Sequence, residues 1–220
     1  MNRLLEPELM DDPQQAQVYA SANFSKENQD FVDRFLQSYG HELENAHVVD
    51  LGCGPGDIPI RLAQAHPTLR ITAIDASQPM IDIARRMVTE ATLTERIELR
   101  CQRFQDATFS TPVDAIISNS LAHHVPNPLQ FWYFIKTTAK PGAPVLVMDL
   151  IRPESTEDAH ALVEQYAAEE PEKLRQDFYN SLLAAFTEDD VAAHLAELNL
   201  SRLLLDVPDD RHWIVEGRVF

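Results

Sequence analysis

From residue 47 onward, short apolar runs alternate with longer segments that have a helical period. We predict strands at residues 47–51, 69–74, 97–101, 113–117 and 145–150. Helices are predicted at residues 58–65, from a cap at Ser77 to about residue 91, and at 127–139. Strands and helices that alternate in this way form a mostly parallel sheet with helices on both faces. We therefore predict a doubly wound α/β fold.

The two ends of the chain add elements around this sheet. Residues 25–39 give the one convincing helix of the first 40 residues, and residues 152–186 form two acidic helical stretches divided near Pro171. Thr187 caps a further helix to about residue 198, and residues 203–207 and 213–220 are typical of an antiparallel hairpin at a sheet edge. We expect one domain over residues 1–220, with about seven strands, an N-terminal helical cap (1–40) and an inserted helical lid (152–186).

Composition restricts the class of protein. A length of 220 residues suits one domain, and no apolar run approaches the roughly 18 to 20 residues that span a bilayer. The N-terminus lacks the basic and apolar regions of a signal peptide, so we expect a cytoplasmic protein without integral membrane association. Cys53 and Cys101 do not form a Cys-x-x-Cys pair, and no metal site is predicted.

The charge of the chain bears on its substrate. The formal net charge is -17, which sets up a field that repels phosphate backbones. We therefore expect no nucleic-acid partner and a small-molecule substrate.

A glycine turn follows the first predicted strand. Gly52, Gly54 and Gly56 have the spacing G-x-G-x-G, which lets the backbone turn sharply and approach a ligand closely. Asp57 stands where the third glycine of a dinucleotide-binding turn would accommodate a pyrophosphate, which disfavours a nicotinamide dehydrogenase. Asp75 lies about 20 residues further on, at the distance of an acidic residue that binds ribose hydroxyls. These features favour an adenosine ligand without phosphates.

A series of motifs follows along the chain, at residues 48–57, 74–77, 105–107, 114–118, 121–128, 140–142 and 149–153. Together and in this order they resemble class I S-adenosylmethionine-dependent methyltransferases, in the ubiquinone/menaquinone-methyltransferase-like (type 11) branch. The resemblance is good over residues 48–153 and loose elsewhere, and it implies a Rossmann-like fold. It also implies S-adenosylmethionine as cofactor, with S-adenosylhomocysteine as product.

The resemblance implies cofactor-binding roles for particular residues. Asp50 and the glycine turn would hold the methionine end, and Asp75 would bind the ribose hydroxyls. Asp106 would accept from the adenine amino group, and Ser118 would lie near the methyl group. The implied cofactor-binding set is Asp50, Gly52, Cys53, Gly54, Gly56, Asp75, Ala76, Met80, Gln105, Asp106, Ala107 and Ser118.

Methyl transfer requires alignment of donor and acceptor, and a hydroxyl or carbon acid also needs a proton acceptor. His123 and His124 are the candidate catalytic residues because they follow the fourth strand, whose end faces the cofactor cleft. Packing roles for both histidines are an equal alternative. The residues proposed to contact substrate are Tyr19, Asn119, Arg152 and Tyr179, with Phe178 and Asn180 beside them; Arg152 could instead pair with a neighbouring glutamate.

Two other functions share these binding features. One is an S-adenosylmethionine-binding regulatory protein without catalysis, and the other is an S-adenosylmethionine enzyme with non-methyl chemistry. The branch resemblance implies a quinone-like carbon or a small-molecule heteroatom as acceptor. The sequence leaves the acceptor atom open, and the assembly open between a monomer and a homodimer.

Overall fold

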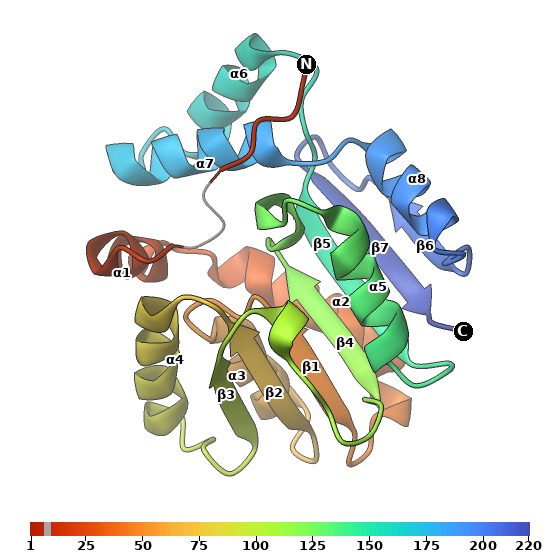
Figure 1. The fold of residues 1–220 in the computed structure, drawn as a ribbon. Coiled ribbons are helices and arrows are strands. Elements are labelled where there is room, and N and C mark those ends of the chain that lie inside the picture. Colours follow the sequence, from red (N-terminus) through yellow and green to blue (C-terminus); the bar gives the residue numbers. More distant parts are fainter. Residues whose placement is uncertain (7–9) are drawn as a thin grey trace.

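The computed structural model describes residues 1–6 and 10–220. Seven strands in this described part form one sheet in the order β3-β2-β1-β4-β5-β7-β6 (Figure 1). Neighbours among the first five strands are parallel, whereas β7 is antiparallel to β5 and β6. This confirms the predicted sheet and its antiparallel hairpin. The strands are β1 (His47–Leu51), β2 (Arg70–Asp75), β3 (Ile97–Cys101), β4 (Ala115–Asn119), β5 (Pro144–Leu150), β6 (Leu203–Asp206) and β7 (His212–Arg218).

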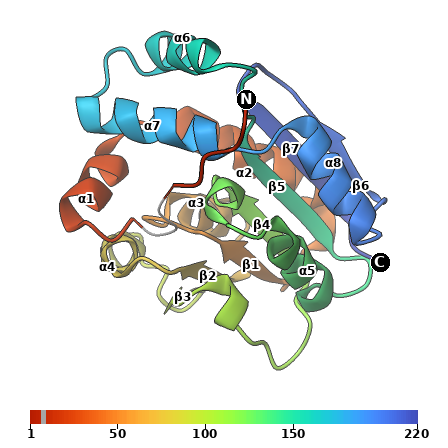
Figure 2. The same ribbon diagram turned by 45° about the horizontal axis from the view of Figure 1, so that its top comes forward.

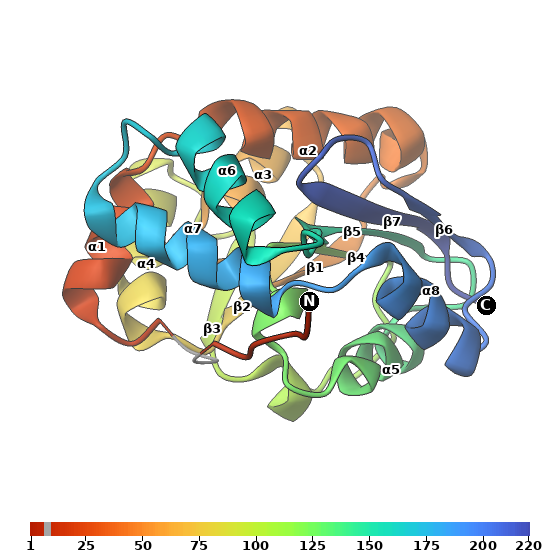
Figure 3. The same ribbon diagram turned by 90° about the horizontal axis from the view of Figure 1, so that it is seen from above.

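Helices cover both faces of the sheet, as Figures 2 and 3 show. One face packs against α2 (Ser25–Tyr39), α3 (Asp57–Ala65) and α4 (Gln78–Glu90). The other packs against α5 (Pro128–Thr138) and α8 (Glu188–Glu197). Thr187 caps α8 as predicted, and Asp190 completes a capping box with it. Successive strand residues point to opposite faces, so Val48 joins the first core and Val49 the second.

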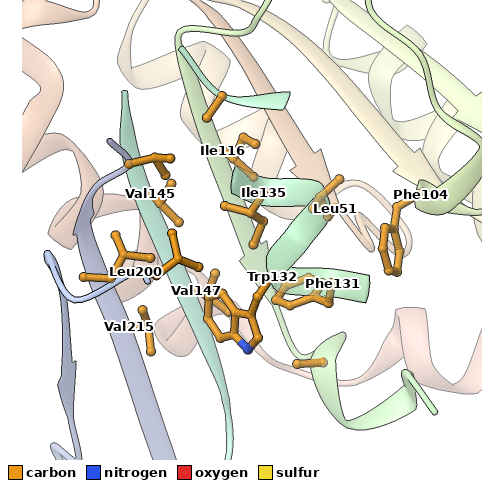
Figure 4. Close-up of a cluster of buried hydrophobic side chains, with 14 of the residues drawn as sticks. Leu51, Phe104, Ile116, Phe131, Trp132, Ile135, Val145, Val147, Leu200 and Val215 are labelled. Carbon is orange, nitrogen blue, oxygen red and sulfur yellow. The ribbon is translucent and has the colours of Figure 1, made fainter. Parts of the chain in front are cut away.

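Figure 4 shows the second core, where α5 lies on the sheet. Trp132 is 1% exposed and packs among side chains of β1, β4, β5 and β7, including Leu51 and Val147. Because parallel strands are buried on both faces, they contain nearly continuous apolar runs, and this made them predictable. The fourth strand is displaced two residues from the predicted 113–117, since Val113 makes only an isolated bridge to Ala139.

Three helices lie over the carboxyl ends of the strands: α1 (Pro13–Ser21), α6 (Thr156–Tyr166) and α7 (Glu172–Ala184) (Figures 1 and 3). Helix α6 and helix α7 are the two stretches predicted around Pro171. Helix α1 corrects the expectation of one helix in the first 40 residues. Asp12 caps it and Pro13 starts it, but Ala16 is its one buried residue among those described, so the helix has no apolar stripe.

Short 3₁₀ helices complete the described elements: η1 (Gly40–Glu42), η2 (Phe104–Asp106) and η3 (Ala122–His124). Within residues 1–6 and 10–220, none of the helices has the length and apolar character needed to cross a membrane.

Candidate functional site

A cavity of about 620 Å³ lies at the carboxyl ends of the parallel strands. Its wall comes from the glycine turn after β1, the loops after β2 and β4, and η2 and η3. The opposite side is closed by the N-terminal segment (residues 1–6 and 10–12), by α1 and by α7. Ligands of open α/β sheets bind at this edge, so the cavity is the candidate active site.

The glycine turn brings the backbone to the cavity wall. Gly52, Gly54 and Gly56 all have positive φ, and the amide of Gly52 donates to the Ile74 carbonyl at 2.8 Å. A Cβ at Gly52 would lie 2.8 Å from Leu121 Cβ, so this position requires glycine. At Gly54 an added Cβ would have no heavy atom of the described chain within 4 Å. Gly54 therefore leaves space for a ligand close to its backbone.

Asp75 lies at the end of β2 and lines the cavity. Its carboxylate accepts hydrogen bonds from the amides of Gly54, at 2.9 Å, and Ser77, at 2.8 Å. Burial raises the pKa of Asp75 in spite of these two bonds. Ser77 also caps α4, as predicted. Asp75 is thus held in a fixed orientation with its carboxylate at the wall.

Asp50 lies on β1, directly before the turn, and is 2% exposed. Its Oδ2 has no hydrogen-bond partner among the described residues. Burial, followed by the negative charge of Asp75, raises the pKa of Asp50 to about 8. A buried carboxyl without a partner is costly, and a ligand cation nearby would compensate for it.

Gln105 lines the cavity from η2, and its buried Oε1 has no partner within the described part of the chain. The neighbouring Asp106 is exposed and does not line the cavity. Ser118 is fully buried and donates to the Leu51 carbonyl at 2.8 Å. The structure therefore presents Gln105 rather than Asp106 as an acceptor at this wall.

The predicted cofactor residues divide into two groups. Those that line the cavity are Gly52, Gly54, Asp75, Ala76, Met80 and Gln105. Those that lie outside its lining are Asp50, Cys53, Gly56, Asp106, Ala107 and Ser118.

The predicted histidines meet two carboxylates. His123 is 3% exposed, and its Nδ1 lies 2.5 Å from Asp149 Oδ1 on β5. Glu6 Oε1 lies 3.3 Å from His123 Nε2 and 3.4 Å from His124 Nδ1. Burial alone would lower the pKa of His123, but the charge and hydrogen bond of Asp149 outweigh it and raise that pKa. Burial raises the pKa of Glu6. These four side chains form one polar cluster at the cavity.

Polar contacts hold the N-terminal segment at this cluster. The Arg3 guanidinium donates to the carbonyls of His123, at 2.8 Å, and Ala184, at 2.5 Å. Ser181 Oγ on α7 donates to Glu6 Oε1 at 3.1 Å. No role was predicted for Glu6, because no local sequence pattern indicates that this segment folds back over the sheet. Asp149 belongs to residues 149–153, one of the segments that carry the resemblance, and it lies near the end of a predicted strand. That position was the signal that could have placed Asp149 at the site.

The predicted substrate residues also fall into two groups, those that line the cavity and those that do not. Tyr19 and Asn119 line the cavity, together with Phe178 and Asn180. Burial, with the charges of Asp75 and Asp149, raises the pKa of Tyr19 to about 12.

Arg152 and Tyr179 lie elsewhere. Arg152 Nη2 is 2.9 Å from Asp190 Oδ2 on α8, which is a pairing with an aspartate rather than with a neighbouring glutamate. Tyr179 stacks on His160 of α6 at a centroid distance of 4.4 Å. Neither residue is among the described residues that line the cavity.

The cavity has a surplus of negative charge in the described residues. Its acidic lining residues are Glu6, Asp11, Asp12, Glu27, Asp75, Glu170 and Asp177, and its basic ones are Arg103, Lys173 and Arg211. Such a field favours a cationic ligand.

Comparison with known proteins agrees with this geometry. Residues 48–142 match the family model described as a methyltransferase domain. A demethylmenaquinone methyltransferase of Lactiplantibacillus plantarum is 31% identical over 120 residues, which are 52% of this chain and 49% of that protein. A trans-aconitate 2-methyltransferase of Streptomyces coelicolor is 33% identical over 96 residues, which are 44% of this chain and 32% of that protein. The chain spans about half or less of the length of these relatives.

Two solved structures share the fold over nearly the whole chain. The plantazolicin methyltransferase BpumL, in complex with a pentazolic desmethylPZN analog and SAH, has a TM-score of 0.69 at 13% identity, covering 94% of this chain and 90% of that one. A SAM-dependent methyltransferase from Aquifex aeolicus has a TM-score of 0.65 at 18% identity, covering 95% and 99%. Residues 48–142 are thus similar to a methyltransferase domain, and the chain shares the Rossmann-like fold of these two structures.

Proposed function

We propose that the chain is an enzyme that transfers a methyl group from S-adenosylmethionine to a small-molecule acceptor and releases S-adenosylhomocysteine. The observation that carries this proposal is the pair of carboxyls beside the glycine turn. Asp75 lines the cavity, and Asp50 is buried behind the turn with an unpartnered oxygen. A ligand with an ammonium and a sulfonium group would favour the ionised form of both carboxyls, including Asp50, whose pKa burial raises to about 8.

The residues fit this ligand in separate parts. Asp50 and the backbone of Gly52 and Gly54 would hold the methionine end, and Asp75 would accept from the ribose hydroxyls. Gln105 has a buried acceptor without a partner in the described residues, and it would accept from the adenine amino group. The cofactor supplies an activated methyl group on a cationic sulfur. The protein has to exclude water and orient the acceptor toward it.

The side of the cavity opposite the glycine turn would bind the acceptor. Tyr19 and Asn119 line it, and His123 or His124 would take a proton from an acceptor that carries one. Residues 152–186 and 1–40 would act as a lid and a cap on a single domain. Helix α7 supports this division because Phe178 and other residues of it line the cavity.

The proposed acceptor is a small molecule because the net charge of -17 opposes binding of nucleic acid. The relatives include enzymes named for demethylmenaquinone and trans-aconitate. The acceptors to test are therefore small molecules that offer either a quinone-like carbon or a heteroatom. We propose a cytoplasmic monomer or homodimer, and the free thiols of Cys53 and Cys101 suit a reducing compartment.

Calorimetric titration with S-adenosylmethionine and S-adenosylhomocysteine tests the proposal. Both should bind, and incubation of a metabolite extract with labelled donor should give a labelled product detectable by mass spectrometry. Asp75→Ala should weaken binding at least about tenfold, since it removes the ribose acceptor. Lack of binding by both compounds would refute the proposal. Binding without a labelled product would favour a regulatory protein, and a product labelled from another part of the cofactor would indicate non-methyl chemistry.

A further inference from the structure

Three side chains with metal-ligating atoms converge where the N-terminal segment crosses η3. The ligating atoms of Glu6, His123 and His124 all lie within 4.8 Å of one another. Two of the separations are 3.3 Å, from Glu6 Oε1 to His123 Nε2, and 3.4 Å, from Glu6 Oε1 to His124 Nδ1. All three residues line the cavity.

These separations have the size expected of ligands around one ion. Ligands at about 2.0–2.1 Å from Zn²⁺ in tetrahedral geometry lie roughly 3.3–3.4 Å from one another. A charge-assisted hydrogen bond from imidazolium to carboxylate is shorter, at about 2.7–2.9 Å. Both separations from Glu6 Oε1 therefore match ligands of a shared ion better than a direct ion pair.

The surrounding groups orient the ligands. Asp149 is 1% exposed and accepts from His123 Nδ1 at 2.5 Å, which leaves Nε2 unprotonated in the neutral ring and turned toward Glu6. Ser181 Oγ donates to Glu6 Oε1 at 3.1 Å. The Arg3 guanidinium donates to the backbone carbonyls of His123 and Val125 and so fixes the turn that carries both imidazoles. Metal-bound histidines commonly have a carboxylate partner of this kind.

We propose that Glu6, His123 and His124 bind one divalent transition-metal ion, for which Zn²⁺ is the probe, with Asp149 as the orienting partner of His123. Two imidazoles and one carboxylate form the donor set of catalytic zinc sites, in which a fourth position stays open. Here that position would face the cavity. No metal site was predicted from the sequence, because neither cysteine lies in a Cys-x-x-Cys pair; Glu6 is also far from His123 and His124 in the chain.

A role for the open position rests on the proposed function. A hydroxyl or thiol of the methyl acceptor would bind there, and coordination would lower its pKa. The two histidines would then hold the ion instead of taking a proton, and the proton released by the hydroxyl or thiol would pass to solvent water.

The test measures metal binding by the full chain. The protein is prepared without an affinity tag and is first freed of metal with a chelator. Zn²⁺ is titrated by calorimetry, and Co²⁺ is followed by visible absorption, which reports four-coordination. Glu6→Gln, His123→Gln and His124→Gln remove one ligand each, and Asp149→Asn removes the orienting carboxylate. Glu44→Gln and His41→Gln, at exposed positions, are matched controls. Circular dichroism selects the variants that are folded.

We expect one Zn²⁺ per chain in the wild type and in both controls. Each ligand variant should lose more than about 100-fold in affinity, and Asp149→Asn should lose roughly 10- to 100-fold. Because His124 is partly exposed, its variant remains informative if the substitutions at buried sites do not fold. Absence of Zn²⁺ binding, or equal binding in His124→Gln, would overturn the proposal. Titration of the same wild-type sample with S-adenosylhomocysteine separates the two hypotheses, because either ligand can bind without the other.

Discussion

Replacement of Asp50 by Asn should make the protein more stable and at the same time weaken its binding of cofactor. Burial and the charge of Asp75 raise the pKa of Asp50 from its ordinary 3.8 to about 8. At pH 7 the folded state holds this proton, and the unfolded state has released it. The difference corresponds to a penalty of roughly 4 kcal/mol at 1.36 kcal/mol per pH unit. Asn has nearly the same shape and carries no charge in either state, so the variant escapes the penalty.

The pH dependence gives the sign of the effect. Below the ordinary pKa of 3.8 both states are protonated, so wild type and variant should have similar free energies of unfolding. Between pH 4 and 8 the wild type should lose stability relative to Asp50→Asn by up to about 1.36 kcal/mol per pH unit. Above pH 8 the difference should stay constant. Urea denaturation across this range measures it, with Asp82→Asn on the exposed face of α4 as control.

Cofactor affinity should change in the opposite direction. The wild type should bind S-adenosylhomocysteine more tightly as the pH rises toward 8, because the ligand ammonium favours the ionised carboxyl. Asp50→Asn should bind roughly 10- to 100-fold more weakly, as expected for loss of a charged hydrogen bond. A variant that is less stable than the wild type at pH 8, or that has the same pH slope, would refute this account of the buried carboxyl.

Other substitutions test the turn, the core and the edge of the site. Gly52→Ala should lower the free energy of unfolding, measured by urea denaturation, by at least about 2 kcal/mol. Its φ is +73°, and the new Cβ would clash with Leu121. Gly54→Ala should cost only about 1–2 kcal/mol but should weaken binding of S-adenosylhomocysteine in calorimetry, because the added methyl group would occupy ligand space. Trp132→Ala should cost about 3–5 kcal/mol by the same denaturation assay. Arg152→Ala should lower the free energy of unfolding by about 1.5–3 kcal/mol, because the contact with Asp190 is lost. It should leave the KM for the acceptor unchanged. A raised KM would mean that Arg152 contacts the substrate after all.

The sheet was predictable because its signals are local. Each parallel strand is a short apolar run, and Ser77 and Thr187 both cap helices at the predicted positions. The glycine turn was equally readable, since three glycines with positive φ directly follow a buried strand. Helix α1 was missed because a helix that buries little apolar surface leaves no periodic pattern.

The site was only partly predictable because it joins segments that are distant in the chain. The sequence placed His123 and His124 at the end of a strand, but nothing near either residue indicated Glu6. Gln105 and Asp106 are adjacent and both polar, and the 3₁₀ turn determines which of them faces the cavity. Arg152 has a partner on α8, and that choice depends on where the fold places α8, which contacts α5 and β6, rather than on the neighbouring glutamates.

The N-terminal segment closes the cavity through polar anchors more than through apolar packing. Leu4 and Leu5 are 57% and 59% exposed, so they contribute little burial. Arg3 and Glu6 make the directional contacts, each of which is worth about 1–3 kcal/mol. Opening of residues 1–6 would expose little apolar surface, so we expect it at a lower free energy than unfolding of the sheet core. A ligand that binds Glu6 together with the histidines would stabilise the closed form, so closure and ligand binding are coupled through one carboxylate.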